Sequence, residues 1–469
     1  MIRTRFAPSP TGFIHVGNLR SAIFTYLIAK SGKSGKFLLR VEDTDQVRYV
    51  EGATEVIYNT LKTCGLFWDE GPDVGGDYGP YIQSERMESY KQYAEQLVVK
   101  GEAYYCFCSE ERLNKLREEA LEKKENFFYD GYCKSLSKEE IDEKIKNGEK
   151  YVIRQVTPNT GETSFDCQVY GHISIQNDQI EDQILLKSDG YPTYNFANVI
   201  DDHLMNITHV VRGNEYLTST PKYTLLYNAF GWEEPAYVHL PHVIKENGKK
   251  LSKRDGDAYF SDFVDKGYLP EAIVNYLALL GWSPEGKKEM FTLSGLEKVF
   301  SIKRINKSPA VFDIQKLNWV NSNYIKKLES DKLVEICLPH LEKANIDVSD
   351  SVWVNKLCNL FKDRINYAAE IVDQYNEFFS EFSMGEEAKE FMQAEGVEET
   401  VKIFKQKLET IEWNSDKIKE AINETGKDAE VKGKMLFMPC RIATTGAMHG
   451  PDLPKALELL GKDKVLSRM

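Results

Sequence analysis

The first hundred residues alternate short apolar runs with one amphipathic pattern. "RTRFA" and "FLLRV" have the composition of β-strands, while "NLRSAIFTYLIAK" places Leu19, Ile23 and Leu27 at helical spacing. A loop that contains Pro and Gly separates the first strand-like run from this helix. A strand, such a loop and a helix, in that order, predict the opening of a nucleotide-binding α/β unit.

The pattern changes over residues 101–185. A cysteine-rich entry and the charged helical stretch "SEERLNKLREEALEKKE" precede strand-like pieces such as "KYVIRQV". The sheet pattern then resumes in "DQILLKSDGYPTYNFANVIDD" and "NITHVVRG". We interpret residues 101–185 as an insertion between two halves of one α/β domain.

Beyond about residue 320 the strand signals disappear. Apolar residues recur there at helical spacing in two stripes: Leu357, Phe361, Ile365, Ala368 and Val372, then Val401, Phe404, Leu408 and Ile411. This C-terminal part has the size of a domain of its own. We therefore predict an all-α domain after the α/β region.

Composition narrows the class of protein. With 469 residues, 42% hydrophobic and 28% charged, the chain is expected to form two to four globular domains. No apolar run could cross a bilayer and no export signal is evident, so we expect a cytoplasmic protein. The net charge of −13 argues against non-specific coating of nucleic acid. Eight cysteines are too few for a disulfide framework, so clustered cysteines are weighed first as metal ligands.

The loop "APSPTGFIHVGN" is a candidate phosphate site. Gly12 and Gly17 allow close approach of the backbone, and the N–H groups that open a helix bind phosphate. His15 can add a hydrogen bond to a phosphoryl oxygen. A structural turn with an incidental histidine is the alternative, because short motifs match by chance.

A second candidate is "NGKKLSKRDG", where four cations fall within six positions of an acidic chain. Lys250 and Lys253, with the neighbouring Lys249 and Arg254, could close over a triphosphate and stabilise the charge on a departing pyrophosphate. The alternative is a solvated charged loop, where most lysine clusters lie.

Together "HVGN" and "KLSKR" resemble the HIGH and KMSKS signatures of class I aminoacyl-tRNA synthetases. Further blocks, among them "TRFAPSPTGFIHVGNLR", "RVEDTD", "DEGPDVGG", "LLKSDGYPTYNFANVIDDHLM" and "GPDLPKALELLGKDKVL", resemble bacterial glutamyl-tRNA synthetases over essentially the whole chain. The resemblance implies a Rossmann-type catalytic domain with an inserted acceptor-stem-binding subdomain, and an all-α anticodon-binding domain. The implied boundaries are 1–100 with 186–235 for the catalytic domain, 101–185 for the insertion, 236–320 for a connecting domain with the KLSKR loop, and 321–469 for the helical domain.

The same resemblance implies an activity. ATP would activate glutamate to glutamyl-adenylate, and the 2′-hydroxyl of the terminal adenosine of tRNA would accept the glutamyl group. ATP is then a substrate, with Mg²⁺ on its triphosphate, and tRNA for glutamate is a partner. Whether tRNA for glutamine is also charged stays open, and a monomer is expected because the family is usually monomeric.

The family's motifs imply the site residues. Arg5 would bind the side-chain carboxylate of glutamate in bidentate geometry, Glu42 its ammonium, and Arg212 would act as a second arginine at the substrate. The full glutamate set is Arg5, Ala7, Ser9, Glu42, Tyr194, Asn198 and Arg212. The ATP set is His15, Gly17, Lys250, Leu251, Ser252, Lys253 and Arg254, of which His15, Lys250 and Lys253 are assigned to catalysis.

Several of these residues have other interpretations. Arg5 and Glu42 could pair with one another, and Tyr194 could lie in the core. Asp201, Asp202 and His203 suggest a metal site, but the stretch recurs in the family without that role, so we interpret them as structural hydrogen-bonding groups. Asn18 stands where the general signature has a second histidine, and we expect it to cap the helix.

Cys106 and Cys108 alternate onto one face of a strand-like entry, so both thiolates could reach one ion. With Cys133 they resemble the zinc module of some glutamyl-tRNA synthetases. Ser135 stands where other members have a histidine, and the resemblance favours Tyr129 as the fourth ligand of a structural Zn²⁺. Three buried or free cysteines are the alternative.

In the helical domain, the resemblance places Arg364 near an arginine that discriminates among anticodons; a solvated helix charge is the alternative. The sequence leaves four rival functions. They are a shorter paralogue that glutamylates a queuosine base in tRNA, a glutaminyl-tRNA synthetase with a β-barrel anticodon region, a nucleotidyltransferase for a small metabolite, and a non-catalytic tRNA-binding protein. The helical C-terminal part disfavours the first three.

Overall fold

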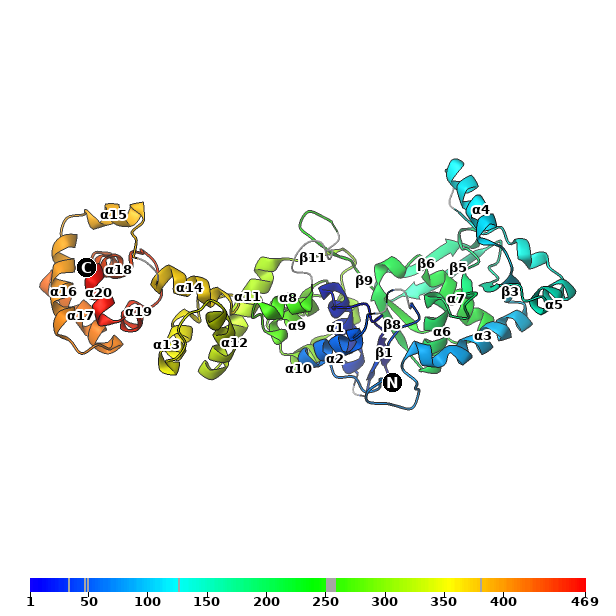
Figure 1. The fold of residues 1–469 in the computed structure, drawn as a ribbon, viewed down its shortest axis with the longest axis horizontal. Helices are drawn as coiled ribbons and strands as arrows, with labels where there is room; N and C mark the ends of the chain where they lie inside the picture. Colours follow the sequence, from blue (N-terminus) through cyan, green and yellow to red (C-terminus); the bar gives the residue numbers. More distant parts are fainter. Residues whose placement is uncertain (33, 46–47, 49, 125–126, 250–258, 380–381) are drawn as a thin grey trace. The chain divides into compact units, whose positions relative to one another are not determined.

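The computed structural model describes residues 1–469 except 33, 46–47, 49, 125–126, 250–258 and 380–381. The chain divides into two compact units (Figure 1). The first, called the α/β unit, comprises residues 1–262 and 273–313. The second, called the helical unit, comprises residues 263–272 and 314–469.

The predicted strands form two parallel pairs in the α/β unit. β1 (Arg3–Phe6) pairs in parallel with β2 (Lys36–Leu39), and β8 (His209–Gly213) in parallel with β9 (Ala236–Leu240). β1 lies beside β8, because Thr208 N donates to the Arg3 carbonyl at 3.0 Å. The sequence therefore predicted both the first strand–loop–helix unit and the return of the chain to strands beside it.

Helices pack against these strands. α1 (Val16–Lys30) contacts β1, β2 and β8. One apolar core is shared by α3 (Met87–Lys100), α6 (Tyr194–Leu204) and α7 (Thr220–Phe230). The other elements of this unit include α2 (Ala53–Thr63), β10 (Val243–Ile244), α10 (Leu293–Val299) and β11 (Ala310–Val311), whereas α8 (Phe260–Asp265) and α9 (Pro270–Leu279) contain residues of both units.

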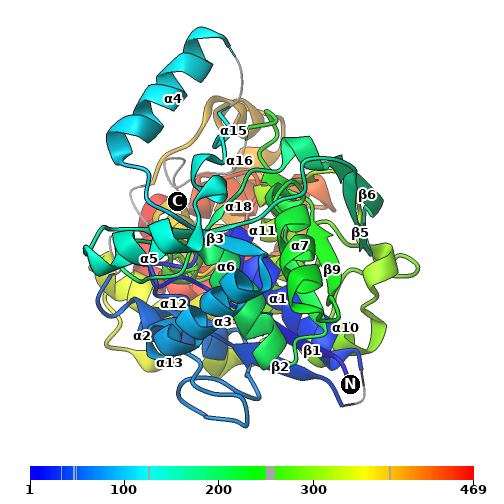
Figure 2. The same ribbon diagram turned by 90° about the vertical axis from the view of Figure 1, so that its right-hand side faces the viewer.

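The inserted segment builds a second small sheet. β3 (Ala103–Cys106), β4 (Val152–Gln155) and β7 (Ile184–Leu186) pair antiparallel in that order. α4 (Glu110–Glu122) and α5 (Lys138–Lys146) bury none of their residues, and Figures 1 and 2 both show α4 extending away from the strand it follows.

The main sheet, which contains β8 and β9, continues past the strands that the sequence assigned to it. β5 (Glu162–Cys167) pairs in parallel with β9 through Cys167 and Tyr237, and antiparallel with β6 (Gly171–Gln176). β5 and β6 come from the segment interpreted as the insertion, and β9 from the segment interpreted as the connecting domain. Strand pairing is set by tertiary contacts, so the predicted boundaries at 185 and 235 do not coincide with the limits of the sheet.

The helical unit has one apolar core. Its helices are α11 (Ile314–Ile325), α12 (Ser330–Lys343), α13 (Ser351–Phe361), α14 (Glu370–Phe379), α15 (Glu386–Met392), α16 (Val397–Thr410), α17 (Ser415–Asp428), α18 (Lys434–Thr445), α19 (Leu453–Leu460) and α20 (Lys462–Arg468). Among described residues, the last strand ends at Val311, as the loss of strand signals predicted.

The two predicted apolar stripes both enter this core, but they differ in structure. Phe404 and Leu408 lie on α16 and are buried, as expected for one helix. The other stripe is interrupted: Phe361 ends α13, while Ile365 and Ala368 lie in the connection to α14 and are equally buried. The helical period therefore predicted burial correctly even where the helix itself ends.

None of the helices in the described part of the chain is both long enough and apolar enough to cross a membrane.

Candidate active site

A cavity of about 760 Å³ opens at the carboxyl ends of β1, β2 and β8, where open α/β sheets bind ligands. Six of the seven residues predicted for glutamate line it: Arg5, Ala7, Ser9, Glu42, Tyr194 and Arg212. The seventh, Asn198, is buried on α6 and contacts Arg212 rather than the cavity. The structure thus brings the predicted set together from elements far apart in the chain.

Arg212 is a buried cation of this cavity that has unused hydrogen-bonding capacity. Its side chain is 6% exposed, and Nη2 donates to Asn198 Oδ1 at 3.3 Å. Asn198 is held in turn by a 2.6 Å hydrogen bond from Nδ2 to the Tyr194 carbonyl. Among described residues, Nε and Nη1 of Arg212 have no hydrogen-bond partner. Because unpaired buried donors are costly, these two N–H groups are suited to a carboxylate.

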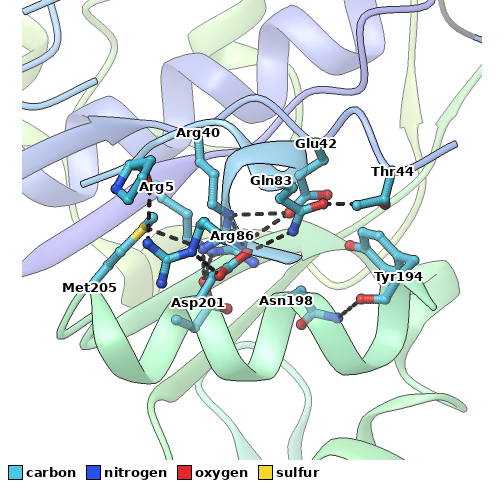
Figure 3. A network of polar contacts seen from close by, with 12 residues as sticks. Arg5, Arg40, Glu42, Thr44, Gln83, Arg86, Tyr194, Asn198, Asp201 and Met205 are labelled. Atoms are coloured by element: carbon cyan, nitrogen blue, oxygen red, sulfur yellow. Dashed lines mark hydrogen bonds and ion pairs between the residues drawn. The ribbon is translucent and has the colours of Figure 1, made fainter. Parts of the chain in front are cut away.

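Arg5 and Glu42 do not pair with one another, so the alternative interpretation of these two residues is wrong. Arg5 Nε donates to Asp202 Oδ1 at 2.8 Å, and Arg40 Nη2 donates to Glu42 Oε1 at 2.9 Å. Figure 3 shows Arg5 from β1, Arg40 and Glu42 from the segment after β2, and Asp201 from α6 itself converging above that helix. Both predicted ligands therefore have a fixed partner on the side away from the substrate space.

Asp201 and Asp202 are hydrogen-bonding groups, as interpreted from the sequence. Asp201 accepts from Arg86 Nε at 2.7 Å, Gln83 Nε2 at 2.8 Å and Tyr90 OH at 2.9 Å. His203 has a different role from the one expected: its ring stacks on Trp232 with centroids 3.6 Å apart. The same turn of α6 thus carries two buried anions and one aromatic contact, and no metal is needed to account for it.

The buried charged side chains near the cavity form a network with no net charge, and one buried cation, Arg212, lies outside it. Three arginines and three carboxylates are joined by ion pairs, and we call them the ion-pair network: Arg5, Arg40, Arg86, Glu42, Asp201 and Asp202. Arg212 lies outside these pairs. The described part of the cavity therefore offers one uncompensated buried positive charge to a ligand.

The pKa values of Glu42 and Asp202, the two carboxylates bonded to Arg40, are shifted in opposite directions. Burial raises the pKa of Glu42, and the charges of Arg40 and Arg5 only partly oppose it. Burial also acts to raise the pKa of Asp202, but Arg5 and Arg40 outweigh it, so that this pKa lies below its usual value. Asp202 is thus held as an anion, while the charge of Glu42 depends on its arginine neighbours.

The start of α1 differs from the expectation. The helix begins at Val16 and its N-cap is His15, whose Nδ1 accepts a hydrogen bond from Gly17 N at 3.0 Å. The prediction that Asn18 caps the helix is wrong, because the imidazole nitrogen already takes the acceptor role. Asn18 lies in the first turn and lines the cavity.

The predicted ATP residues Lys250, Leu251, Ser252, Lys253 and Arg254 lie outside the described residues, but both flanks of their loop are described. On the C-terminal side, Tyr259 pairs with His15 as an antiparallel bridge, and Phe260 N donates to the Ile14 carbonyl at 3.1 Å. On the N-terminal side, Lys245 N donates to the Lys249 carbonyl at 2.8 Å, which closes a turn. One end of the lysine-rich loop is thus attached beside the predicted phosphate loop.

Arg20 is a residue that the sequence interpretation missed. It is 2% exposed on α1, and its Nη2 donates to the Pro241 carbonyl at 2.5 Å, at the exit of β9. Burial lowers the pKa of Arg20 to about 10. The contact joins the helix of the phosphate loop to the strand that leads toward the lysine-rich loop. An arginine at helical spacing among apolar residues was the available signal.

Other missed residues belong to the cavity itself. Arg48 and Lys187 line it, and they add two cations to those predicted. Arg40 was missed as well, although it does not line the cavity: it bonds to Glu42 and to Asp202, a predicted hydrogen-bonding group 162 residues away in the chain. "RVEDTD" and "NVIDDH" marked both segments, but no local pattern pairs one with the other.

The cysteine cluster assembles in the small sheet. The Sγ atoms of Cys106, Cys108 and Cys133 lie within 4.8 Å of one another. Tyr129 OH is 3.3 Å from Cys106 Sγ and 3.3 Å from Cys108 Sγ. A hydrogen bond from Cys133 lowers the pKa of the Cys106 thiol to about 4. Four donor atoms of the predicted set therefore converge on one point.

Arg364 lies in the helical unit between α13 and α14. Its side chain is exposed, and Nε donates to Gln374 Oε1 at 3.2 Å. Arg364 is also close enough to Arg441 for its charge, after burial, to lower the pKa of that guanidinium. The position is compatible with the anticodon role predicted for it and with a solvated charge.

Comparison with known proteins agrees with this geometry. Residues 1–319 match the family of class I tRNA synthetases (E and Q), catalytic domain, and residues 332–469 match an anticodon binding domain. A glutamate–tRNA ligase of Clostridium botulinum (strain Hall) is 51% identical over 475 residues, covering 100% of this chain and 97% of that protein. One of Clostridium acetobutylicum is 50% identical over 474 residues, with the same coverage.

Solved structures are similar over the same length. A glutamate–tRNA synthetase of Elizabethkingia anophelis is 35% identical with a TM-score of 0.91. A glutamate tRNA ligase of Elizabethkingia meningosepticum, in complex with its amino acid, is 34% identical with a TM-score of 0.89. Each covers 100% of this chain and 98% of the other.

These matches confirm the fold class predicted from the sequence and exclude the rivals. A shorter base-modifying paralogue does not account for the matched anticodon binding domain, and no strand follows residue 311 among those described, as a β-barrel would require. The chain belongs to the glutamate–tRNA ligases, a branch of the class I aminoacyl-tRNA synthetases.

Proposed function

We propose that this chain activates glutamate with ATP in the 760 Å³ cavity and then transfers the glutamyl group to tRNA. The main support for glutamate as the ligand of this cavity is that the charge of the buried side chains matches the charge of glutamate. The ion-pair network is neutral, and Arg212 adds one buried positive charge with two unpartnered donors among the described residues. Glutamate, with two carboxylates and one ammonium, carries the single net negative charge that compensates it.

Different residues of the cavity bind the different charged groups of glutamate. Arg5 is held by Asp202 through Nε and faces the cavity, so it binds the side-chain carboxylate. Glu42 pairs with the ammonium, and Arg212 binds a carboxylate oxygen through its free N–H groups. Ser9 and Tyr194 line the same space and add neutral hydrogen bonds. Glutamine lacks the net charge and would leave Arg212 uncompensated.

The activation step rests on position and charge rather than on a covalent enzyme nucleophile. The α-carboxylate of glutamate attacks the α-phosphorus of ATP, and pyrophosphate leaves. The start of α1, with His15 and Gly17, holds phosphate oxygens, and Lys250 and Lys253 follow the pyrophosphate. Mg²⁺ carried by the triphosphate would neutralise part of its charge. The 2′-hydroxyl of the terminal adenosine of tRNA then attacks the acyl carbon, and AMP leaves.

The cysteine cluster fits a structural zinc ion. Three thiols and one phenol oxygen supply four donors, the number that closed zinc sites use. Cys106, Cys108, Cys133 and Tyr129 would hold the ion, which would link β3 to the segment that follows α4. Metal analysis of the reduced, purified protein should find one zinc per chain, and Cys133→Ser should lose it. Cys440→Ser, a buried lone thiol in α18, should keep it; finding no zinc in the wild type removes the site.

Charging assays test the whole proposal. Purified tRNA for glutamate and tRNA for glutamine are each incubated with ATP and radioactive glutamate. Label should appear on the first tRNA, and the result with the second decides how far the enzyme discriminates. Failure to charge tRNA for glutamate, with folded protein and intact tRNA, contradicts the proposal.

Lys253 tests the role of the lysine-rich loop. Lys253→Ala should depress the rate of glutamate activation far more than the affinity for ATP, because its charge is used in the transition state. Lys245→Ala is a matched control, since Lys245 closes the preceding turn through its backbone. Equal losses in rate and ATP affinity would assign Lys253 to ground-state binding instead.

A further inference from the structure

Arg40 is the most central member of the ion-pair network, although it does not line the cavity. Its side chain is 0% exposed. Nη2 and Nε donate to Glu42 Oε1 at 2.9 Å and 3.3 Å, and Nη1 donates to Asp202 Oδ1 at 2.7 Å. One guanidinium thus contacts both Glu42, which lines the cavity, and Asp202, which does not.

The two contacts of Arg40 lead to two different ends of the substrate. Both hydrogen bonds to Glu42 end on Oε1, which leaves Oε2 for the ammonium in the cavity that Glu42 lines. The oxygen of Asp202 that accepts from Arg40 also accepts from Arg5 Nε, at 2.8 Å. Arg40 therefore fixes Glu42 directly, and it fixes Arg5 through a shared carboxylate oxygen.

We propose that Arg40 is a positioning residue for glutamate, an inference that rests on the proposed function. It keeps Glu42 ionised and oriented toward the ammonium, and with Asp202 it orients Arg5 toward the side-chain carboxylate. Only arginine has a rigid fork with enough donors to satisfy both carboxylates at once; lysine offers a single compact ammonium. Without the fork, a buried Glu42 would take up a proton and cease to attract the ammonium.

A purely structural ion pair would give a different result in ligand binding. Glutarate has the two carboxylates of glutamate but no ammonium, so the ratio of the two dissociation constants measures the ammonium contact with Glu42 alone. A structural defect would weaken both ligands alike and leave this ratio unchanged. Norvaline, which lacks the side-chain carboxylate, measures the contact with Arg5 in the same way.

The experiment compares Arg40→Lys with Arg3→Lys. Arg3 is a matched control, because it is also buried in the α/β unit and forms a bidentate pair with Glu70, at 2.8 Å and 3.1 Å. Both variants keep the positive charge on which folding depends. Affinities for glutamate and glutarate are measured by titration calorimetry on the full chain, with and without tRNA, after circular dichroism has confirmed folding.

Arg40→Lys should reduce the preference for glutamate over glutarate by about tenfold, as expected for one charge-assisted hydrogen bond, while Arg3→Lys leaves it within about twofold. An unchanged preference in folded Arg40→Lys overturns the inference. Should that variant not fold, Asp202→Asn decides: the preference for glutamate over norvaline must fall about tenfold, and an unchanged value overturns it. A wild type that does not prefer glutamate to either analogue contradicts the proposed function instead.

Discussion

The two units of this chain treat buried charge in opposite ways. In the α/β unit, buried arginines, aspartates and glutamates surround the cavity, and six of them are joined by ion pairs. In the described part of the helical unit, no charged side chain is buried. The polar residues buried there are mainly threonines, such as Thr400, Thr425 and Thr444, whose hydroxyls donate to carbonyls of their own helices.

The difference follows from what each unit has to bind. A free amino acid with three charged groups must be enclosed, so the protein has to bury counter-charges and hold them with one another. Residues 332–469 match an anticodon binding domain, which binds its nucleic acid at the surface. The interior of such a domain needs no buried charge and can be stabilised by apolar packing. Burial of charge is thus a cost of substrate recognition in one unit and is unnecessary in the other.

The largest effect on activity is expected for the buried arginine that would bind the substrate. Arg212→Ala should lower kcat/KM for glutamate by about 10³-fold, or about 4 kcal/mol, because it removes the cation that compensates the ligand. The free energy of unfolding should fall by no more than about 1 kcal/mol, since only Nη2 has a hydrogen-bond partner among the described residues, Asn198. Steady-state charging and urea unfolding measure the two quantities. Arg117→Ala, on the exposed face of α4, is the control, and its KM for glutamate should stay within about twofold. Equal losses of activity and stability would make Arg212 structural.

The next effect concerns apolar packing in the helical unit. Phe404→Ala should lower the free energy of unfolding of this unit by about 3 kcal/mol, because Phe404 is 0% exposed and leaves a cavity among its neighbours. Phe437→Ala is the matched control: that ring is 48% exposed and its loss should cost less than about 0.5 kcal/mol. Thermal unfolding followed by calorimetry compares them. Similar costs for the two substitutions would show that the helical core is not the source of stability.

A smaller effect depends on pH and concerns a buried histidine of the α/β unit. Burial, and then the charge of Arg212, lowers the pKa of His239 to about 3, and its ring contacts Thr220 Oγ1 and Cys167 Sγ. The unfolded chain binds the proton below its usual pKa of 6.5, whereas the folded chain does not until about pH 3. Stability is therefore lost as pH falls through this window, by about 1.4 kcal/mol per pH unit.

His239→Gln isolates this contribution from those of the other titrating groups. Between pH 6.5 and pH 5 the wild type should lose about 2 kcal/mol of unfolding free energy relative to the variant, as measured by urea unfolding at each pH. Parallel curves over that interval would mean that His239 is already protonated in the folded protein.

The smallest effect is expected for surface charge in the helical unit. Lys332 and Glu335 form a 2.6 Å ion pair with side chains 68% and 63% exposed. Lys332→Ala should change the free energy of unfolding by less than about 0.5 kcal/mol, and 1 M salt should remove the difference. A loss above 1 kcal/mol would contradict the view that this unit owes little to its charges.

The sequence by itself predicted the main secondary-structure elements and the kinds of chemistry that the sequence motifs support. Hydrophobic period predicted β1, α1 and the helical unit, because the burial of side chains at every second or every third to fourth position is a local property. Cysteine spacing predicted that Cys106 and Cys108 could meet. Resemblance supplied the identities of the glutamate residues, and the cavity contains six of the seven.

Tertiary structure decided which charge pairs with which. Arg5 pairs with Asp202, 197 residues away, and not with Glu42; Arg40 joins the two carboxylates; and His15, not Asn18, caps α1. It also placed β9 and β5 in the main sheet. The physical reason is common to all of these cases: the partner of a buried polar group is the one that the path of the chain brings within hydrogen-bonding distance, and nothing in the neighbouring residues specifies that path.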